Sequence, residues 1–180
     1  ITRGFGDALR IGYQNRPRLF DPHIVLPSLL YSKVMEVDER LDRDGHVLIP
    51  LDVAAVREQL RAAYQEGFRA VAVTLMHAYR YPAHEAAIEQ IATQIGFAQI
   101  SVSHKISPLM KLISRGDTTV VDAYLSPILR RYVDKVASNI GAVTIYFMQS
   151  NGGLTQARSF HGKDAILSGP AGGIVGMVRT

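Results

Sequence analysis

Two glycine-bearing segments near the end of the printed sequence carry residue types that bind anions. The first is MQSNGG at residues 148–153, and the second is LSGPAGG at residues 167–173. Glycine permits positive φ and close approach of the backbone to a ligand, and consecutive N–H groups form an anion-binding concavity. The two segments are therefore the first candidates for a ligand site.

The first segment follows a predicted buried strand over residues 143–148, at the strand's carboxyl end. In open α/β sheets, ligands bind at such ends. The functional interpretation is that Asn151 and the glycine N–H groups line a cleft; the alternative is a turn that needs only positive φ. The candidate residues for a substrate or phosphate cleft are Gln149, Ser150, Asn151, Gly152 and Gly153.

The second segment places small residues at the start of a predicted helix. Small residues let a helix cross closely against a neighbouring helix, and a helix N-terminus also favours anions. We expect a hinge or packing role here in preference to direct phosphate contact. The residues concerned are Ser168, Gly169, Pro170, Gly172 and Gly173.

His77, His84 and Glu85 are residue types that bind metals, but their spacing fits no common metal motif. It is neither the i, i+4 spacing of a helical HExxH nor that of a zinc finger. We therefore expect loop histidines that hydrogen-bond the backbone, and no metal site. The neighbouring aromatic residues in segment 79–81 suit either shielding of a lobe interface, which we favour, or a ligand clamp.

Arg115, Asp117 and Thr118 precede a stretch with helical spacing. Capping of that helix is the simpler explanation, because it needs only a local side-chain oxygen. The alternative is that Arg115 reaches a substrate carboxylate.

Alternating helices and strands position these candidates. Asp52 suits a helix N-cap, Gly96 a helix end, and Asp44-Gly45 a hairpin turn. This order predicts βαβ crossovers and a mixed sheet, with the strand at 70–76 covered on both faces. We expect residues 15–17 to end the first helix, and the last long helix to break near 115–117 and restart at 126–127. Helices are expected over residues 5–14, 52–66, 82–95 and 109–139, and strands over 34–41, 47–49, 70–76, 99–103 and 143–148.

Composition excludes several classes of protein. The 180 residues are 47% apolar, enough for a core, and no apolar run approaches a membrane span of about 20 residues. The chain has no cysteine, which excludes disulfides and fits a cytoplasmic location. Its formal charge of +4 comes from basic residues spread along the chain, so nucleic acid is not an expected partner.

The chain resembles the hydantoinase A and 5-oxoprolinase family along nearly its whole length. The matching segments occur in the family's order at plausible spacing, which makes the combined signal specific. They are TRGFGDALRIGYQNRPRLFD (2–21), VDERLDRDGHVLIPLD (37–52), AVAVTLMHAYRYPAHE (70–85), SHKISPLMKLISRGDTTVVDAYLSPILRRYV (103–133), MQSNGGL (148–154) and LSGPAGGIVG (167–176).

The resemblance implies an α/β fold: a fragment of an actin-like ATPase (ribonuclease H-like) fold with a mixed sheet and flanking helices. In that fold two lobes close on ATP and magnesium, and residues 168–173 would open an interlobe helix near the nucleotide. It further implies that residues 1–104 end the family's N-terminal domain and that residues 105–180 begin its main domain.

Members of the family couple ATP cleavage to opening of a cyclic amide or imide, such as 5-oxoproline or a hydantoin, and relatives carboxylate ketones. A lactam carbonyl is a poor electrophile, and phosphorylating its oxygen supplies a leaving group. The resemblance therefore implies a small cyclic amide substrate, ATP and magnesium as cofactors, and a second, hydantoinase B-like subunit or domain. A ketone carboxylase and a non-catalytic actin-like subunit are the alternatives.

The sequence departs from the family pattern at the phosphate loops. The acidic D-x-G-G-T loops are absent, and we expect one before Ile1 and another beyond Thr180, so that this fragment alone does not hydrolyse ATP. Asp122 replaces an expected asparagine, and Ser114 replaces an expected glutamate before Arg115. We also expect self-association, because a truncated sheet exposes apolar edges.

Overall fold

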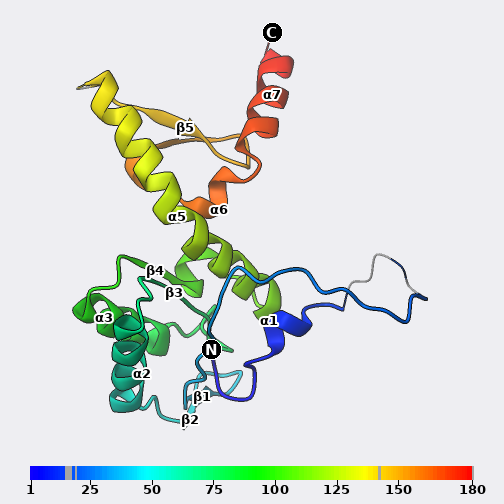
Figure 1. Ribbon diagram of the computed structural model, residues 1–180, viewed down its shortest axis with the longest axis vertical. Coiled ribbons are helices and arrows are strands. Elements are labelled where there is room, and N and C mark those ends of the chain that lie inside the picture. Colours follow the sequence, from blue (N-terminus) through cyan, green and yellow to red (C-terminus); the bar gives the residue numbers. More distant parts are fainter. Residues whose placement is uncertain (15–17, 19, 142, 180) are drawn as a thin grey trace. The chain divides into compact units, whose positions relative to one another are not determined.

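The computed structural model describes residues 1–14, 18, 20–141 and 143–179, and it is a mixture of helices and short strands (Figure 1). The chain divides into two compact units, Ile1–Val120 and Val121–Thr180. Helix α5 (Leu112–Ile140) belongs partly to each unit. Each unit is described by itself.

In its described residues, the first unit contains helices and two two-stranded sheets before α5 begins. Its elements are α1 (Ala8–Ile11), β1 (Arg40–Leu41), β2 (Val47–Ile49), α2 (Val53–Gln65), β3 (Ala70–Val73), α3 (Ala83–Ile95), β4 (Gln99–Val102) and α4 (Ser103–Ile106). The second unit follows α5 with β5 (Tyr146–Met148), β6 (Leu154–Gln156), a 3₁₀ turn (Ala157–Ser159), α6 (Gly162–Ala165) and α7 (Ser168–Arg179).

A βαβ crossover forms the centre of the first unit, as predicted. Strands β3 and β4 pair in parallel from Ala70 opposite Gln99 to Val73 opposite Val102, and α3 connects them. The buried apolar faces of α2 and α3 pack with these strands around one core. The core includes Val56, Leu60, Ala63, Val73, Leu75, Ile88, Ile91, Ala92 and Val102.

Local signals correctly predicted where the two packed helices begin and end. The Asp52 carboxylate accepts a hydrogen bond of 2.9 Å from the Ala55 N–H at the start of α2. Gly96 ends α3 in the left-handed conformation, with φ of 102°. The Asp52 cap and the left-handed Gly96 each depend on residues within one or two helical turns. Sequence alone therefore predicted them.

The predicted hairpin is present as the antiparallel pair β1–β2, although its first strand is shorter than expected. Only Arg40 and Leu41 form a strand, and the register shifts between them. Upstream, Val37 exchanges backbone hydrogen bonds with Ile1 and Arg3, at 2.8 and 3.0 Å. Because residues 35–37 pair with the first residues of the chain, the predicted strand over 34–41 is not continuous.

The turn of this hairpin is held by the Asp42 carboxylate. It accepts hydrogen bonds of 2.8 Å from the Asp44 N–H, the His46 N–H and the His46 imidazole. The bond with the His46 side chain is the main reason why the pKa of Asp42 falls to about 2. Gly45 completes the turn with φ of 92°, and a Cβ added to it would lie 2.6 Å from Tyr81 Cε1.

Two other predicted elements are shorter. The helix predicted over 5–14 is reduced to α1, because Gly12 and Gln14 both have φ of 55°; its predicted end at 15–17 lies outside the described residues. The strand predicted over 70–76 ends at Val73, and Ala70 is exposed, so it is not covered on both faces. Beyond Val73, side chains replace strand partners, as described below.

The predicted break in the long helix is wrong, because α5 is continuous through Arg115 and Pro127. The hydroxyls of Thr118 and Thr119 donate to the carbonyls of Ser114 and Arg115, at 2.8 and 2.6 Å, and so add bonds to the turn where a break was expected. Just before Pro127, a hydrogen bond of 3.1 Å from Ser126 Oγ to the Asp122 carboxylate spans the turn.

The strand predicted over 143–148 is also shorter and less buried than expected. Strand β5 pairs antiparallel with β6 as a two-stranded hairpin, with Tyr146 opposite Gln156. Tyr146 is 54% exposed, because these two strands are the whole sheet among the described residues. Helix α7 packs beside β5 (Figure 1).

No helix of the described residues is long and apolar enough to span a membrane. Both units leave some of their large apolar side chains exposed to solvent. Exposed examples include Val47, Leu48 and Ile49 of β2, and Leu154, Ile174, Met177 and Val178 in the second unit.

We expect the isolated chain to self-associate, because contiguous exposed apolar side chains favour association. Light scattering should show species larger than a monomer. Replacing Leu48 and Leu154 together by Lys should shift the population toward monomer, whereas the exposed control Ala54→Lys adds charge without removing a large apolar side chain. A monodisperse wild-type monomer would contradict the prediction.

We expect Gly45→Ala to destabilise the first unit more than Gly67→Ala. Both glycines have positive φ, of 92° and 102°, so each substitution costs about 1–2 kcal/mol of backbone strain. A Cβ on Gly45 would also lie 2.6 Å from Tyr81 Cε1, whereas Gly67 has open space. The Tyr81 clash should add about 1–3 kcal/mol in denaturant unfolding. Equal losses for the two variants would show that Tyr81 moves aside freely.

Candidate functional site

The first predicted glycine segment is the loop of the β5–β6 hairpin, and its backbone is bonded to itself. The Gln149 N–H donates to the Gly153 carbonyl at 2.8 Å, and the Gly152 N–H donates to the Gln149 carbonyl at 2.9 Å. The Asn151 side-chain oxygen accepts from the Gly153 N–H at 2.8 Å. Gly152 has φ of 82°, as a tight turn requires.

Ser150 ties this loop to the residue before α7. Its Oγ donates to the Asp164 carbonyl at 2.7 Å and accepts from the Leu167 N–H at 3.0 Å. The Ser150 N–H donates to the same Asp164 carbonyl at 2.7 Å. One serine therefore fixes the loop against α6 and the start of α7.

The structure brings the two predicted glycine segments together. A Cβ on Gly152 would lie 3.3 Å from Val175 Cγ2, and a Cβ on Gly172 would lie 3.6 Å from Met148 Cγ. These two glycines therefore permit close packing of α7 on the hairpin. The expected hinge or packing role of residues 168–173 against a helix of a second lobe stays a prediction. Ser168 Oγ donates to the Ala165 carbonyl at 2.8 Å, at the junction of α6 and α7.

Several candidate residues remain accessible at this junction: Asn151, Gly153, Gly169, Pro170 and Gly173 are exposed. Nothing lies within 4 Å of a Cβ built on Gly169 or Gly173. The first turn of α7 contains no acidic residue, so its N-terminus offers a positive dipole end to an anion. Contact of these residues with a substrate or phosphate stays a prediction.

Arg115 lies in the first unit, inside α5, so helix capping by Arg115, Asp117 and Thr118 is wrong: α5 already begins at Leu112. The Arg115 side chain is fully buried, and burial lowers the pKa of its guanidinium. Its Nη2 donates to the Leu75 and Met76 carbonyls at 2.5 and 3.0 Å. Contact between Arg115 and a substrate carboxylate stays a prediction.

Arg115 belongs to a cluster that sequence reasoning missed, which we call the Leu75–Met76 clamp and define as Thr2, Glu85 and Arg115. The Glu85 carboxylate accepts from the Leu75 N–H at 2.8 Å, and Thr2 Oγ1 accepts from the Met76 N–H at 3.0 Å. All three clamp residues are fully buried. The available signal was Glu85 itself, a carboxylate on the apolar face of α3.

The predicted backbone partners of the two histidines are wrong. His84 lies in α3, and its Nδ1 bonds the Glu39 carboxylate at 2.9 Å. His77 Nδ1 is buried and has no hydrogen-bond partner among the described residues. Within the described ranges, no group of three or more His, Cys, Asp or Glu could hold a metal ion.

The aromatic segment 79–81 packs within the first unit. The Arg115 guanidinium lies 5.5 Å from the centre of the Tyr79 ring, and Arg80 lies 5.3 Å from that of Tyr81. Shielding of a lobe interface by these rings stays a prediction.

We expect Ser150→Ala to lower the free energy of opening of the second unit by about 1–2 kcal/mol. The substitution removes two hydrogen bonds between the loop and the α6–α7 junction. Hydrogen exchange should show faster exchange of the Leu167 amide. The control Ser138→Ala removes an exposed hydroxyl that bonds only the Lys135 carbonyl, and it should leave the Leu167 amide unchanged. Equal exchange in wild type and Ser150→Ala would contradict the proposed tie.

Known proteins match the chain along almost its full length. Residues 1–96 match the hydantoinase/oxoprolinase N-terminal region, and residues 115–180 match the hydantoinase/oxoprolinase family. The predicted domain boundary after residue 104 falls between these ranges, whereas the compact units divide after Val120. The domain boundary after residue 104 stays a prediction.

One relative is 5-oxoprolinase 1 of Arabidopsis thaliana, which is 39% identical over 203 aligned residues. The match covers 100% of this chain and 16% of the relative, so the chain spans about a sixth of that protein's length.

Two solved structures share the fold. The ATP-dependent caprolactamase from Pseudomonas jessenii aligns with a TM-score of 0.81 and 28% identity, over 94% of this chain and 26% of that one. A nucleotide-free acetone carboxylase aligns with a TM-score of 0.77 and 24% identity, over 98% of this chain and 28% of that one.

These neighbours confirm the predicted α/β class of the actin-like ATPase type. The matches to both family regions show that the chain belongs to the hydantoinase/oxoprolinase family, as a fragment of a longer protein.

Proposed function

We propose that the full-length protein containing this chain, called the parent below, opens a cyclic amide or imide of the 5-oxoproline or hydantoin type in an ATP-dependent reaction. The observation that carries the proposal is the accessible junction of the hairpin loop with the α7 N-terminus. All of this chain aligns with part of a 5-oxoprolinase. Such a junction suits an anionic group, and ATP or its transferred phosphoryl group is the anion that this chemistry needs.

The proposed reaction begins when the ring carbonyl oxygen attacks the γ-phosphorus of ATP and ADP leaves. Water then adds to the activated carbon, and the C–N bond breaks with a proton passing to nitrogen. This step leaves an acyl phosphate, which a second water hydrolyses to a carboxylate and phosphate. Phosphorylation is needed because amide resonance makes the unactivated carbonyl a poor electrophile.

ATP and magnesium are the proposed cofactors of the parent. The α7 N-terminus and the exposed Asn151 side chain fit an oxygen-rich anion such as phosphate. Among the described residues, no cluster of carboxylates fits magnesium. We therefore expect magnesium to be held by the nucleotide and by residues elsewhere in the parent, together with the family's acidic phosphate loops.

The proposed substrate and partner of the parent follow from its family. We propose a small cyclic amide as its substrate and a second, hydantoinase B-like subunit or domain as its partner. A cytoplasmic location stays a prediction.

Ketone carboxylation is the second candidate function. The supporting observation is the acetone carboxylase structure, which shares the fold over 98% of this chain. Both reactions activate a carbon–oxygen group with ATP, so the fold suits either.

We expect the purified parent to release phosphate from ATP only when a cyclic amide is added. The assay should compare 5-oxoproline, hydantoin and caprolactam with acetone plus bicarbonate, and follow phosphate and ring opening together. The 180-residue chain alone serves as a control and should release no phosphate. Turnover that requires bicarbonate and a ketone would instead support the carboxylase.

A further inference from the structure

The Leu75–Met76 clamp bonds every backbone polar group of two consecutive residues to a side chain. Glu85 and Thr2 take the two N–H groups, and Arg115 Nη2 takes the two carbonyls. Strand β3 has ended at Val73, so these side chains replace the missing strand partners. The clamp thus fixes the direction in which the chain leaves the carboxyl end of β3.

The turn after the clamp is fixed as well. The N–H groups of Arg80 and Tyr81 both donate to the His77 carbonyl, at 3.1 and 3.0 Å. The Tyr79 ring has two neighbours: its centre is 6.4 Å from that of the His77 ring and 5.5 Å from the Arg115 guanidinium carbon. The backbone position of His77 is therefore set by the buried clamp on one side and by the bonded turn at Arg80 and Tyr81 on the other.

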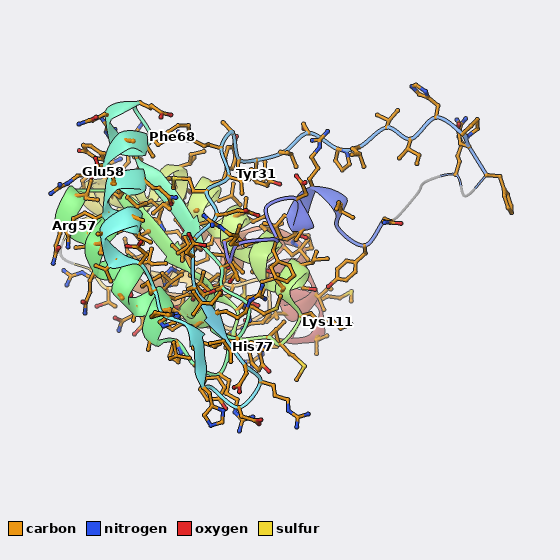
Figure 2. All side chains as sticks on the ribbon, turned by 90° about the horizontal axis from the view of Figure 1, so that it is seen from below. Tyr31, Arg57, Glu58, Phe68, His77 and Lys111 are labelled. Atoms are coloured by element: carbon orange, nitrogen blue, oxygen red, sulfur yellow. The ribbon has the colours of Figure 1, made fainter. Side chains whose placement is uncertain are left out.

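The His77 side chain, by contrast, contacts the Tyr79 ring, but its Nδ1 has no hydrogen-bond partner among the described residues. Its ring is half-buried, and Nδ1 is buried without a hydrogen bond (labelled in Figure 2). His84 and His104 differ, because each bonds a buried carboxylate, Glu39 and Glu85 respectively. Tyr31 Oη and Arg115 Nε are also buried without a hydrogen bond, but among these atoms His77 Nδ1 lies on a fixed turn after β3. Buried polar atoms are nearly always hydrogen-bonded, so we infer that His77 takes a partner from outside the chain.

The place of His77 indicates what that partner is. It follows a strand of a parallel pair at its carboxyl end, where ligands bind in open α/β sheets. An imidazole N–H is a hydrogen-bond donor, which suits the carbonyl oxygen of a cyclic amide or ketone.

We propose that His77 is a substrate-contacting residue of the parent, that its imidazole donates a hydrogen bond to the substrate's carbonyl oxygen, and that Thr2, Glu85 and Arg115 are positioning residues for it. The proposal rests on the proposed function for the identity of the substrate. Cyclic amides and ketones share the carbonyl oxygen, so the experiments below distinguish the two sources.

The first experiment measures KM for 5-oxoproline and for ATP in the parent carrying His77→Ala or His77→Gln. Loss of one hydrogen bond should raise KM for 5-oxoproline about tenfold in His77→Ala. His77→Gln keeps an N–H donor and should recover part of the loss, and KM for ATP should stay unchanged in both. The control is His46→Gln, at the exposed hairpin turn. A His77→Ala KM equal to that of the control would overturn the proposal.

The second experiment needs no turnover and follows carbethoxylation of His77 by diethyl pyrocarbonate with mass spectrometry. Cyclic amide should slow modification of His77 several-fold and leave His46 unaffected. Protection by acetone with bicarbonate alone would reject ring opening yet keep the role of His77. Absence of protection by every probe would overturn the His77 proposal, whether or not the parent opens cyclic amides.

Discussion

The buried carboxylate of Glu85 is the constraint on which the first unit depends. It accepts hydrogen bonds from the Leu75 N–H, from Ser103 Oγ and from both the N–H and Nδ1 of His104. These donors follow β3 and β4, the two strands that α3 connects, so one side chain of α3 ties the ends of both. A buried carboxylate that lost these partners would be strongly destabilising, and the four bonds must therefore form together.

Arg115 completes this arrangement from the other side of the same peptide units. Its guanidinium bonds carbonyls only, at Leu75, Met76 and Leu109, and the Glu85 charge offsets part of the burial that lowers its pKa. Well-packed apolar residues often match or exceed the stability of a buried ion pair. We infer that the clamp is better explained by the backbone position it specifies than by the stability it adds, and the fixed turn at His77 is the feature that such a position would serve.

Sequence patterns predicted the elements whose signals are local, and missed the interactions between distant residues. Asp52 and Gly96 act within a turn or two of themselves, so the bounds of α2 and α3 followed directly from sequence. The continuity of α5 could not be predicted from sequence. Gly116 was expected to break the helix, but in the folded unit it lies against Leu9, a residue far away in the chain. In the candidate site, the tie from Ser150 to Leu167 could not be predicted from sequence, because it depends on folding of the intervening hairpin and α6.

The geometry of the hairpin loop also changes how the second unit would recognise an anion. Glycine N–H groups make an anion-binding concavity only when they are free, and here Gly152 and Gly153 donate within the loop. Asn151 is exposed, and its backbone N–H and side-chain nitrogen bond no other described residue. Under the proposed function, recognition of a phosphate at this junction would therefore fall to Asn151 and the N-terminal dipole of α7. Gly152 and Gly172 instead pack closely against Val175 and Met148.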